Sequence, residues 1–428
     1  FVEKVSEINR MTVHTITTNK YKTNTLVLLL KNQLDEKTVT KRALLPYVLQ
    51  SGTERHPSRK LIREHLDDLY GANLSVNVQK KGEHHVISFR LEIANEKYLQ
   101  NAPSLLNEGI RFLAELLLRP HVENGRFSKT IVESEKRALK QRIQAIHDDK
   151  IRYANVRLTE EMCQGEPFAL MAYGKEEEID AIDEESLYDY YQKIINEDEI
   201  HLYFVGANDA VTVEEYVNEA FQFPGTRSKN TSIEVIPVQK EVKEERQVFE
   251  DQEVLQGKLQ IGFRTYTTYK DDDYYALQVF NGIFGGFSHS KLFTNVREKA
   301  SLAYYVYSQY ESHKGILAVA SGIECSNFER AVKIIKEQWE AMKNGDFSDE
   351  EMEQTKTMIK NQLLETLDVP RTTIELLYHN VVAKKQRSIE EWIRGIEEVT
   401  REEIIQIANK IQLDTVYFLR GKEAGNNE

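Results

Sequence analysis

The sequence contains residues that can bind a metal, but their spacing does not predict a metal site. A hydrolytic zinc helix with the pattern His-x-x-Glu-His uses positions i, i+3 and i+4. These share one helix face and supply two imidazoles for the ion and a carboxylate for its water. The pair Glu64 and His65 fits part of this pattern, but Leu61 stands where the first histidine is needed. A single imidazole on an amphipathic helix is more often a surface residue, so we predict no metal site there.

Other arrangements for catalysis are also missing from the sequence. His84 and His85 are adjacent in a predicted strand, so their side chains point to opposite faces and cannot bind one ion together. The chain has no Gly-x-Ser-x-Gly motif. Cys163 and Cys325 match no metal-ligand or redox spacing. We therefore predict two free thiols in a reducing compartment, and a cytoplasmic protein.

The composition predicts an ordinary soluble globular protein. The chain has 428 residues, of which 40% are hydrophobic, and this length favours two to three domains. Its formal net charge is −13, which argues against nucleic acid or an anionic membrane as a partner, because both require clustered Lys and Arg. The early apolar run at 26–30 has the length of a strand, so we predict no membrane span.

Hydrophobic periodicity predicts a chain of mixed helices and strands. Strands at 12–18 and 25–31 flank a turn and are predicted to pair, and a helix near 41–50 then ends at a Ser-Gly turn. The other predicted elements are helices at 59–70, 102–118, 128–150, 184–195, 274–284 and 400–411, and strands at 73–78, 85–93, 201–206, 258–265, 305–310 and 416–419.

Two short motifs recur at nearly the same offset. The sequence Asn-Gly-Arg-Phe-Ser at 124–128 and the sequence Asn-Gly-Asp-Phe-Ser at 344–348 each precede a long predicted helix. A helix followed by a strand with Tyr-Phe likewise occurs near the end of each half. Such paired echoes indicate two copies of one α/β unit. We predict domains at 1–221 and 247–428, joined by a linker at 222–246 that is rich in Pro, Gly, Ser, Thr and charge.

The most specific motif lies in the second half. Gly-Gly-Phe-Ser-His-Ser-Lys-Leu-Phe at 285–293 continues into Arg-Glu-Lys-Ala-Ser-Leu-Ala-Tyr at 297–304. This run resembles the C-terminal-half signature of the pitrilysin/insulinase family of peptidases, which are inverted zincins similar to mitochondrial processing peptidase. In that family an Arg and a Tyr seven residues apart contact the peptide substrate, and the resemblance assigns this role to Arg297 and Tyr304. The plain structural alternative is that Arg297 pairs with Glu298 or another acid on the surface and that Tyr304 is a core residue.

The resemblance extends over most of both halves. It includes the Ser-Gly-Thr turn at 51–53, the Gly-Ala helix end at 71–72 and the strand at 73–78 with Asn77. It implies an α/β (α+β) fold of two homologous domains, each a mostly antiparallel sheet covered by helices, arranged as a clamshell around a peptide. The strand at 73–78 would be an exposed edge that pairs with the substrate backbone, with Asn77 among the substrate contacts.

The zinc motif of that family is absent. Aligned on the Ser-Gly-Thr turn, the positions of its two histidines and its general base hold Ala43, Pro46 and Tyr47. Glu135 stands at a helper position, but Arg142 stands at the carboxylate-ligand position seven residues later. An arginine keeps its proton and repels a cation. We therefore predict no metal or other cofactor in this chain, and expect the Arg142 guanidinium to occupy the space of the ion beside Glu135.

An intact contact pair without a metal site resembles the non-catalytic member of two-chain peptidases in this family. The resemblance implies a peptide-binding subunit of a processing-protease-like zinc metallopeptidase, with the zinc in a homologous partner chain. A structural or peptide-holding homo-oligomer is the alternative, and an autonomous zinc metalloendopeptidase has the least support. The sequence predicts a dimer but leaves homodimer and heterodimer open.

Overall fold

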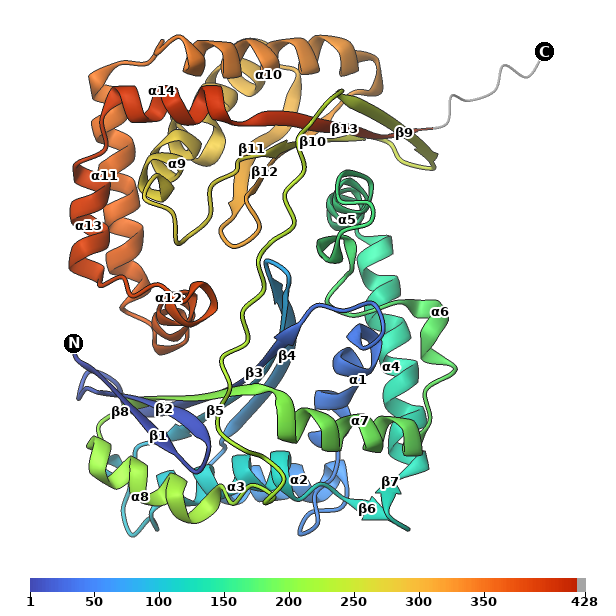
Figure 1. The fold of residues 1–428 in the computed structure, drawn as a ribbon, viewed down its shortest axis with the longest axis vertical. Helices are drawn as coiled ribbons and strands as arrows, with labels where there is room; N and C mark the ends of the chain where they lie inside the picture. The colour runs from blue at the N-terminus through green and yellow to red at the C-terminus, as the bar shows by residue number, and fades with distance from the viewer. Residues whose placement is uncertain (422–428) are drawn as a thin grey trace. The chain divides into compact units, whose positions relative to one another are not determined.

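A computed structural model describes residues 1–421, and its chain divides into two compact units (Figure 1). The first unit comprises 1–80, 84–144 and 170–235, and the second comprises 81–83, 145–169 and the chain from 236 on. Each unit combines a mainly antiparallel sheet with helices, as predicted. The predicted division into 1–221, 222–246 and 247–428 concerns homology and stays a prediction. Packing differs from it by placing 81–83 and 145–169 in the second unit.

The first unit contains a six-stranded sheet. Its strand order is β1 (Glu3–Ile8), β2 (Met11–Thr17), β8 (Glu199–Gly206), β3 (Thr23–Gln33), β5 (His84–Ala94) and β4 (Asn73–Lys81). The predicted pairing of the strands at 12–18 and 25–31 is wrong, because β8 lies between β2 and β3 and pairs with both. Every residue of β8 is buried, so this strand requires a neighbour on each side, and its distance in sequence hides that from a local pattern.

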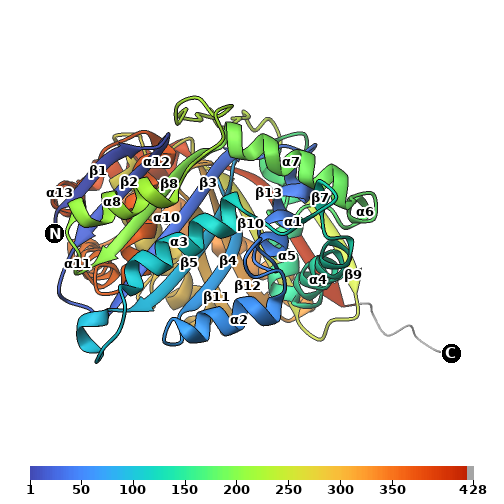
Figure 2. The same ribbon diagram turned by 90° about the horizontal axis from the view of Figure 1, so that it is seen from below.

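Helices cover this sheet and bury its leucine-rich strands. Figure 2 shows α3 (Leu105–Leu118) and α8 (Ala210–Ala220) lying across one face. The core joins residues of β3, β5, α1 and α3, all within one hydrophobic cluster. The other helices that begin in this unit are α1 (Val39–Leu49), α2 (Arg59–Asp68), α4 (Lys129–Asp148), α6 (Glu176–Ile179) and α7 (Glu184–Glu197). A small hairpin of β6 (Val122–Glu123) and β7 (Arg126–Phe127) precedes α4.

The second unit contains a five-stranded sheet. Its order is β11 (Ala303–Glu311), β12 (Ile316–Ile323), β10 (Gly257–Arg264), β13 (Gln412–Gly421) and β9 (Arg246–Gln252). One face carries the main helical layer (Figure 1). Its helices are α9 (Tyr274–Asn281), α10 (Phe328–Lys343), α11 (Asp349–Thr366), α12 (Pro370–Ala383), α13 (Ile389–Glu397) and α14 (Arg401–Lys410), with π-helical turns η3 (Gly282–Gly286) and η4 (Phe293–Lys299).

The repeated motif places a glycine of positive φ and a capping serine before a long helix in both halves. Gly125 and Gly345 both have positive φ, where a side chain would be strained. Ser128 then accepts a hydrogen bond from a backbone N–H in the first turn of α4, and Ser348 does so for α11. The preceding turns differ, because Asn124 is left-handed between β6 and β7, whereas Asn344 has a right-handed conformation at the end of α10. The two halves therefore share the serine cap but not the turn.

The predicted helices do not include α5 (Lys150–Met162), α6, α8, α10, α12 or α13. Of these, α5 follows directly on the helix predicted at 128–150. The break occurs at Asp149, whose side chain accepts a hydrogen bond from the Arg152 N–H and caps α5. Along β13, Val416 and Phe418 pack into the helical layer, whereas the alternate residues pack against α5. The helix α5 therefore covers the opposite face of the second sheet.

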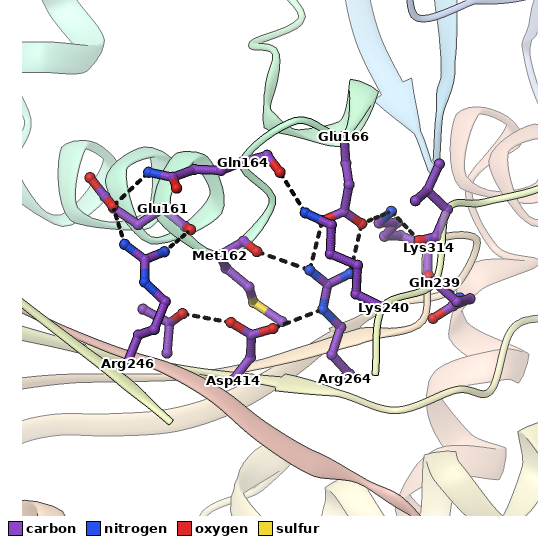
Figure 3. A network of polar contacts seen from close by, with 12 residues as sticks. Glu161, Met162, Gln164, Glu166, Gln239, Lys240, Arg246, Arg264, Lys314 and Asp414 are labelled. Carbon is purple, nitrogen blue, oxygen red and sulfur yellow. Dashed lines mark hydrogen bonds and ion pairs between the residues drawn. The ribbon is translucent and has the colours of Figure 1, made fainter. Parts of the chain in front are cut away.

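Buried ion pairs join the segments 81–83 and 145–169 to the rest of the second unit (Figure 3). Arg264 donates to both carboxylate oxygens of Glu166 at 2.8 and 2.7 Å, and its Nε donates to Asp414 at 3.1 Å. Lys314 donates to Glu166 at 2.9 Å and to Glu83 at 2.5 Å. Burial opposes ionisation of Glu166, but the two cations outweigh it and lower its pKa to about 2. The segments 81–83 and 145–169 are thus anchored by charge as well as by packing.

Two further predictions concern the whole described chain. Both cysteines are free thiols, as predicted, with Cys163 buried and Cys325 half-buried. Within residues 1–421, none of the helices has the length and apolar composition to span a bilayer.

Candidate functional site

The helix α1 holds the three positions at which the resemblance expects zinc ligands and a base. Ala43 and Tyr47 are buried and one turn apart, and Pro46 lies inside the helix, where it removes one backbone N–H. A methyl group, a pyrrolidine ring and a phenol replace two imidazoles and a carboxylate. This face of α1 therefore offers an ion no nitrogen ligand.

Arg142 occupies this position from α4. Its guanidinium carbon lies 3.5 Å from the centre of the Tyr47 ring, which is a close cation–π stack. Its Nη2 lies 3.8 Å from a carboxylate oxygen of Glu135, two turns earlier on the same face of α4. The Glu135 side chain is only 4% exposed. The structure thus brings Tyr47, Glu135 and Arg142 together, with the cation stacked on the ring.

Glu135 has further partners on its other oxygen. The Ser51 hydroxyl lies 3.0 Å from Glu135 Oε1 and 2.7 Å from the Tyr47 carbonyl oxygen, so its proton is shared between two acceptors. Arg59 forms an ion pair with the same carboxylate, and its Nε donates to Ser51 at 3.2 Å. The sequence analysis missed Arg59, although Ser51 belongs to a motif it used. With two guanidiniums and a hydroxyl as partners, Glu135 serves as a structural anion.

The protonation of Tyr47 also disfavours metal binding. Burial and the neighbouring Tyr173 raise the pKa of Tyr47 to about 12, so the phenol is neutral at ordinary pH. Tyr173 is followed by Gly174, which has positive φ and lies so close to Thr40 that a side chain would collide with it. Within residues 1–421 there is no group of three or more His, Cys, Asp or Glu side chains that could hold a metal ion. The cluster can fill space and pair charges, but it has no means of activating water.

The adjacent histidines His84 and His85 lie in the interior of the protein. His84 and His85 are both buried in β5. His85 accepts a hydrogen bond from Arg42 at 3.0 Å, and burial together with that cation lowers its pKa to about 3. Arg42, which no sequence motif singled out, is fully buried, and its Nη1 lies 3.1 and 2.9 Å from the two carboxylate oxygens of Asp198.

The two residues to which the resemblance assigns substrate contact lie on the surface of the second unit. Arg297 is exposed on η4, with its guanidinium carbon 4.9 Å from the centre of the Phe293 ring. Among the described residues its side chain forms no hydrogen bond or ion pair, so the alternative of an Arg297–Glu298 pair is not realised. The guanidinium therefore retains all its donors for another molecule.

Tyr304 is presented by a β-bulge. In the β11–β12 register Ala303 pairs with Ile323 and Tyr305 with Gly322, which leaves Tyr304 as the extra residue. Its side chain is 56% exposed and its hydroxyl donates to Glu324 at 2.6 Å, which raises its pKa. The alternative of a core Tyr304 is thus wrong, because the bulge directs this side chain away from the core.

Asn77 lies exposed on β4, which is the edge strand of the first sheet. The unpaired side of an edge strand offers backbone donors and acceptors to an added strand. The predicted edge location of 73–78 is therefore correct. Asn77 belongs to the first unit, and Arg297 and Tyr304 belong to the second.

Comparison with known proteins relates the chain to a peptidase family. The model described as the peptidase M16 inactive domain matches residues 181–359. The chain is 49% identical over 424 residues to a probable inactive metalloprotease YmfF of Bacillus subtilis (strain 168), covering 99% of both chains. It is also 24% identical over 297 residues to the Bacillus subtilis antilisterial bacteriocin subtilosin biosynthesis protein AlbE, covering 69% of this chain and 72% of the relative.

Solved structures agree with these sequence relatives. A conserved protein from Enterococcus faecalis superimposes with a TM-score of 0.88 at 32% identity, covering 99% of this chain and 100% of the other. A peptidase M16 inactive domain from Pseudomonas fluorescens matches with a TM-score of 0.80 at 14% identity over the whole of both chains, which shows the fold alone. The chain therefore belongs to the M16 peptidases, the pitrilysin/insulinase family that its motifs resemble, and its helix α1 lacks the zinc motif of that family.

Proposed function

We propose that this chain is the peptide-binding subunit of a two-chain zinc metallopeptidase of the processing type, and that Arg297 and Tyr304 complete the active site of a zinc-bearing partner. One observation carries the proposal. Arg142 is stacked and paired in the position of the ion, whereas Arg297 is exposed and has no ionic partner among the described residues. An exposed guanidinium without an ionic partner can bind another molecule.

The chemistry of the pair suits an acyl-transfer site. A guanidinium fork and a phenol hydroxyl can both donate hydrogen bonds to a peptide carbonyl oxygen. Such donors matter most when negative charge develops on that oxygen during attack by water. Tyr304 would exchange its hydrogen bond to Glu324 for one to the substrate. Zinc and the attacking water would come from the partner, because the position in this chain holds Ala43, Pro46 and Tyr47.

The edge strand β4 supports a role in holding peptide. An extended peptide can add to such an edge through main-chain hydrogen bonds, which recognise backbone and tolerate varied side chains. The Asn77 amide, exposed on this strand, can add one side-chain contact. The partner that the proposal requires is a homologous subunit with an intact His-x-x-Glu-His helix.

Reconstitution tests the proposal. The chain, a zinc-bearing M16 homologue from the same source and their equimolar mixture are each assayed for cleavage of a fluorogenic peptide, with zinc measured in every sample. We expect cleavage by the mixture well above the sum of the separate chains, together with a heterodimer in light scattering. A stable homo-oligomer that binds peptide but adds nothing to the partner's turnover would instead support the peptide-holding alternative. Cleavage by the chain alone, abolished by a chelator, would overturn both.

A further inference from the structure

A cavity of about 420 Å³ opens in the first unit and shares no residue with the cluster of Tyr47, Glu135 and Arg142. Its volume lies within the range of small-molecule sites. It is bounded by the loop after α1, by α2 and α3, and by the end of α8. The lining residues that matter here are Arg55, His56, His65, Arg111, Glu115 and Arg119.

The cavity contains a buried carboxylate that is only partly satisfied. Glu115 on α3 is 3% exposed. One of its oxygens lies 3.2 Å from His56 Nδ1, but the other is buried and has no hydrogen-bond partner among the described residues. A buried charged acceptor without a partner is costly, so it favours a molecule that brings a donor.

Two stacked imidazoles stand beside this carboxylate. The rings of His56 and His65 lie 4.2 Å apart, and the Phe112 ring lies 5.1 Å from that of His65. Burial and the neighbouring His56 lower the pKa of His65, so its ring is neutral at pH 7. These three rings line the cavity beside the Glu115 carboxylate.

The frame of the cavity is already formed. Thr53 and His56 exchange hydrogen bonds within the loop, at 2.8 Å from the Thr53 N–H and at 3.0 Å to the Thr53 hydroxyl. The Glu54 N–H donates to the Arg119 carbonyl at 2.9 Å, which ties the loop to the end of α3. A ligand therefore has little ordering entropy to overcome.

The rim carries both signs of charge, with Arg55, Arg111 and Arg119 near Glu108 and Glu219. Arg55 and Arg119 form no side-chain hydrogen bond or ion pair within the described residues, and Arg111 pairs only with Glu108 at 3.4 Å. The guanidiniums of Arg55 and Arg119 can bind an anionic group, often through two parallel hydrogen bonds. The cavity thus combines an unsatisfied anionic acceptor inside with free cationic donors at its rim.

We propose that this cavity binds a small zwitterion, either an amino acid or a short peptide. The ammonium group donates to the free oxygen of Glu115, and the carboxylate accepts hydrogen bonds from Arg55 and Arg119. The site works without a partner subunit and without Arg297 or Tyr304, so it can succeed or fail independently of the proposed peptidase role.

Titration of the isolated chain at pH 7 by calorimetry and by NMR tests the proposal. The probes are L-alanine, L-alanyl-L-alanine, and the N-acetylated and C-amidated forms of the dipeptide. We expect at least one zwitterion to bind saturably, with a dissociation constant below about 10 mM. Blocking either charged end should weaken binding by about 10- to 100-fold. Comparison of alanine with the dipeptide identifies which ligand the cavity takes.

Variants locate the binding. Glu115→Gln should weaken zwitterion binding by about 10- to 100-fold. It should leave the weaker binding of the acetylated dipeptide unchanged. Glu64→Gln is the matched control, because Glu64 is exposed on α2 and lies outside the cavity lining. If Glu115→Gln does not fold, Arg119→Gln at the rim carries the same test for the carboxylate end.

Several results would overturn the proposal. These are the absence of saturable binding by either zwitterion, equal binding of the acetylated dipeptide, and unchanged affinity in both Glu115→Gln and Arg119→Gln. Stoichiometric binding of Zn²⁺ that is lost in Glu115→Gln would also overturn it, because the cavity would then be a metal site.

Discussion

Two arginines, one in each unit, stack on an aromatic ring but differ in everything else. Arg142 lies 3.5 Å from the Tyr47 ring, and its charge is balanced by Glu135. Arg297 lies 4.9 Å from the Phe293 ring, is exposed, and has no ionic partner among the described residues. A guanidinium whose charge is neutralised within its own unit fills space, whereas one that is not neutralised can still bind another molecule. Arg142 is thus packed and paired in the first unit, whereas Arg297 leaves its donors exposed on the surface of the second.

The difference also predicts where substitutions act. Changes in the cluster of Tyr47, Glu135 and Arg142 should alter stability, because buried charges left unpaired are costly. Changes at Arg297 or Tyr304 should alter function with little effect on stability, because exposed side chains contribute little to folding.

The largest effect is expected at the exposed pair. Arg297→Ala and Tyr304→Phe should each lower turnover of the complex with a zinc-bearing partner by about 10²–10³, because a donor to the developing charge is lost. The measurement is kcat, made after light scattering has shown that each variant still associates. Lys299→Ala on η4 and Tyr307→Phe on β11 are matched exposed controls and should retain activity. Full turnover by both test variants would remove the shared-site interpretation.

The next effect concerns the stability of the first unit. Arg142→Glu replaces a stacked cation by an anion beside Glu135, so we expect a loss of about 1–3 kcal/mol in the free energy of unfolding. Urea denaturation measures it. Arg137→Glu is the control, because Arg137 is exposed on the same helix and should change stability by less than about 0.5 kcal/mol. Equal stability of the wild type and Arg142→Glu would show that the stack and the ion pair contribute nothing.

The same variant should leave zinc content unchanged. We expect no stoichiometric zinc in the wild type, and none in Arg142→Glu, because Ala43, Pro46 and Tyr47 still offer no nitrogen ligand. Elemental analysis after dialysis against zinc measures this. About one zinc per chain, lost when residues 43–47 are changed, would contradict the assignment of this position as a filled site.

The smallest effect is a dependence on alkaline pH. The pKa of Tyr47 is raised from 10 to about 12, so the folded state retains a proton that the unfolded state releases. The stability that Tyr47 contributes is therefore complete below pH 10 and is lost as pH rises from 10 through 12. Tyr47→Phe should lack this component in melts followed from pH 9 to 12. Tyr304→Phe, at an exposed phenol, is the comparison and should change the profile less.

Several properties follow from residue types alone. The absence of histidine and carboxylate ligands at 43–47 and 142 can be read from the sequence, because an alanine or proline side chain cannot bind zinc in any fold. Strongly periodic segments also predicted their elements well, as for α7 and α14, since a stripe or a cap is encoded within a few turns. The motif ending at Tyr304 likewise predicted the family, because its residues lie close together in the sequence.

Other properties arose only in three dimensions. The insertion of β8 between β2 and β3, the packing of α5 in the second unit and the stack of Arg142 on Tyr47 all join segments far apart in the chain. The cavity around Glu115 likewise depends on a loop, two helices and the end of a third. A local pattern records which side chains a segment must bury or expose, but not which distant segment will cover them. That choice is made by packing and charge pairing across the folded chain.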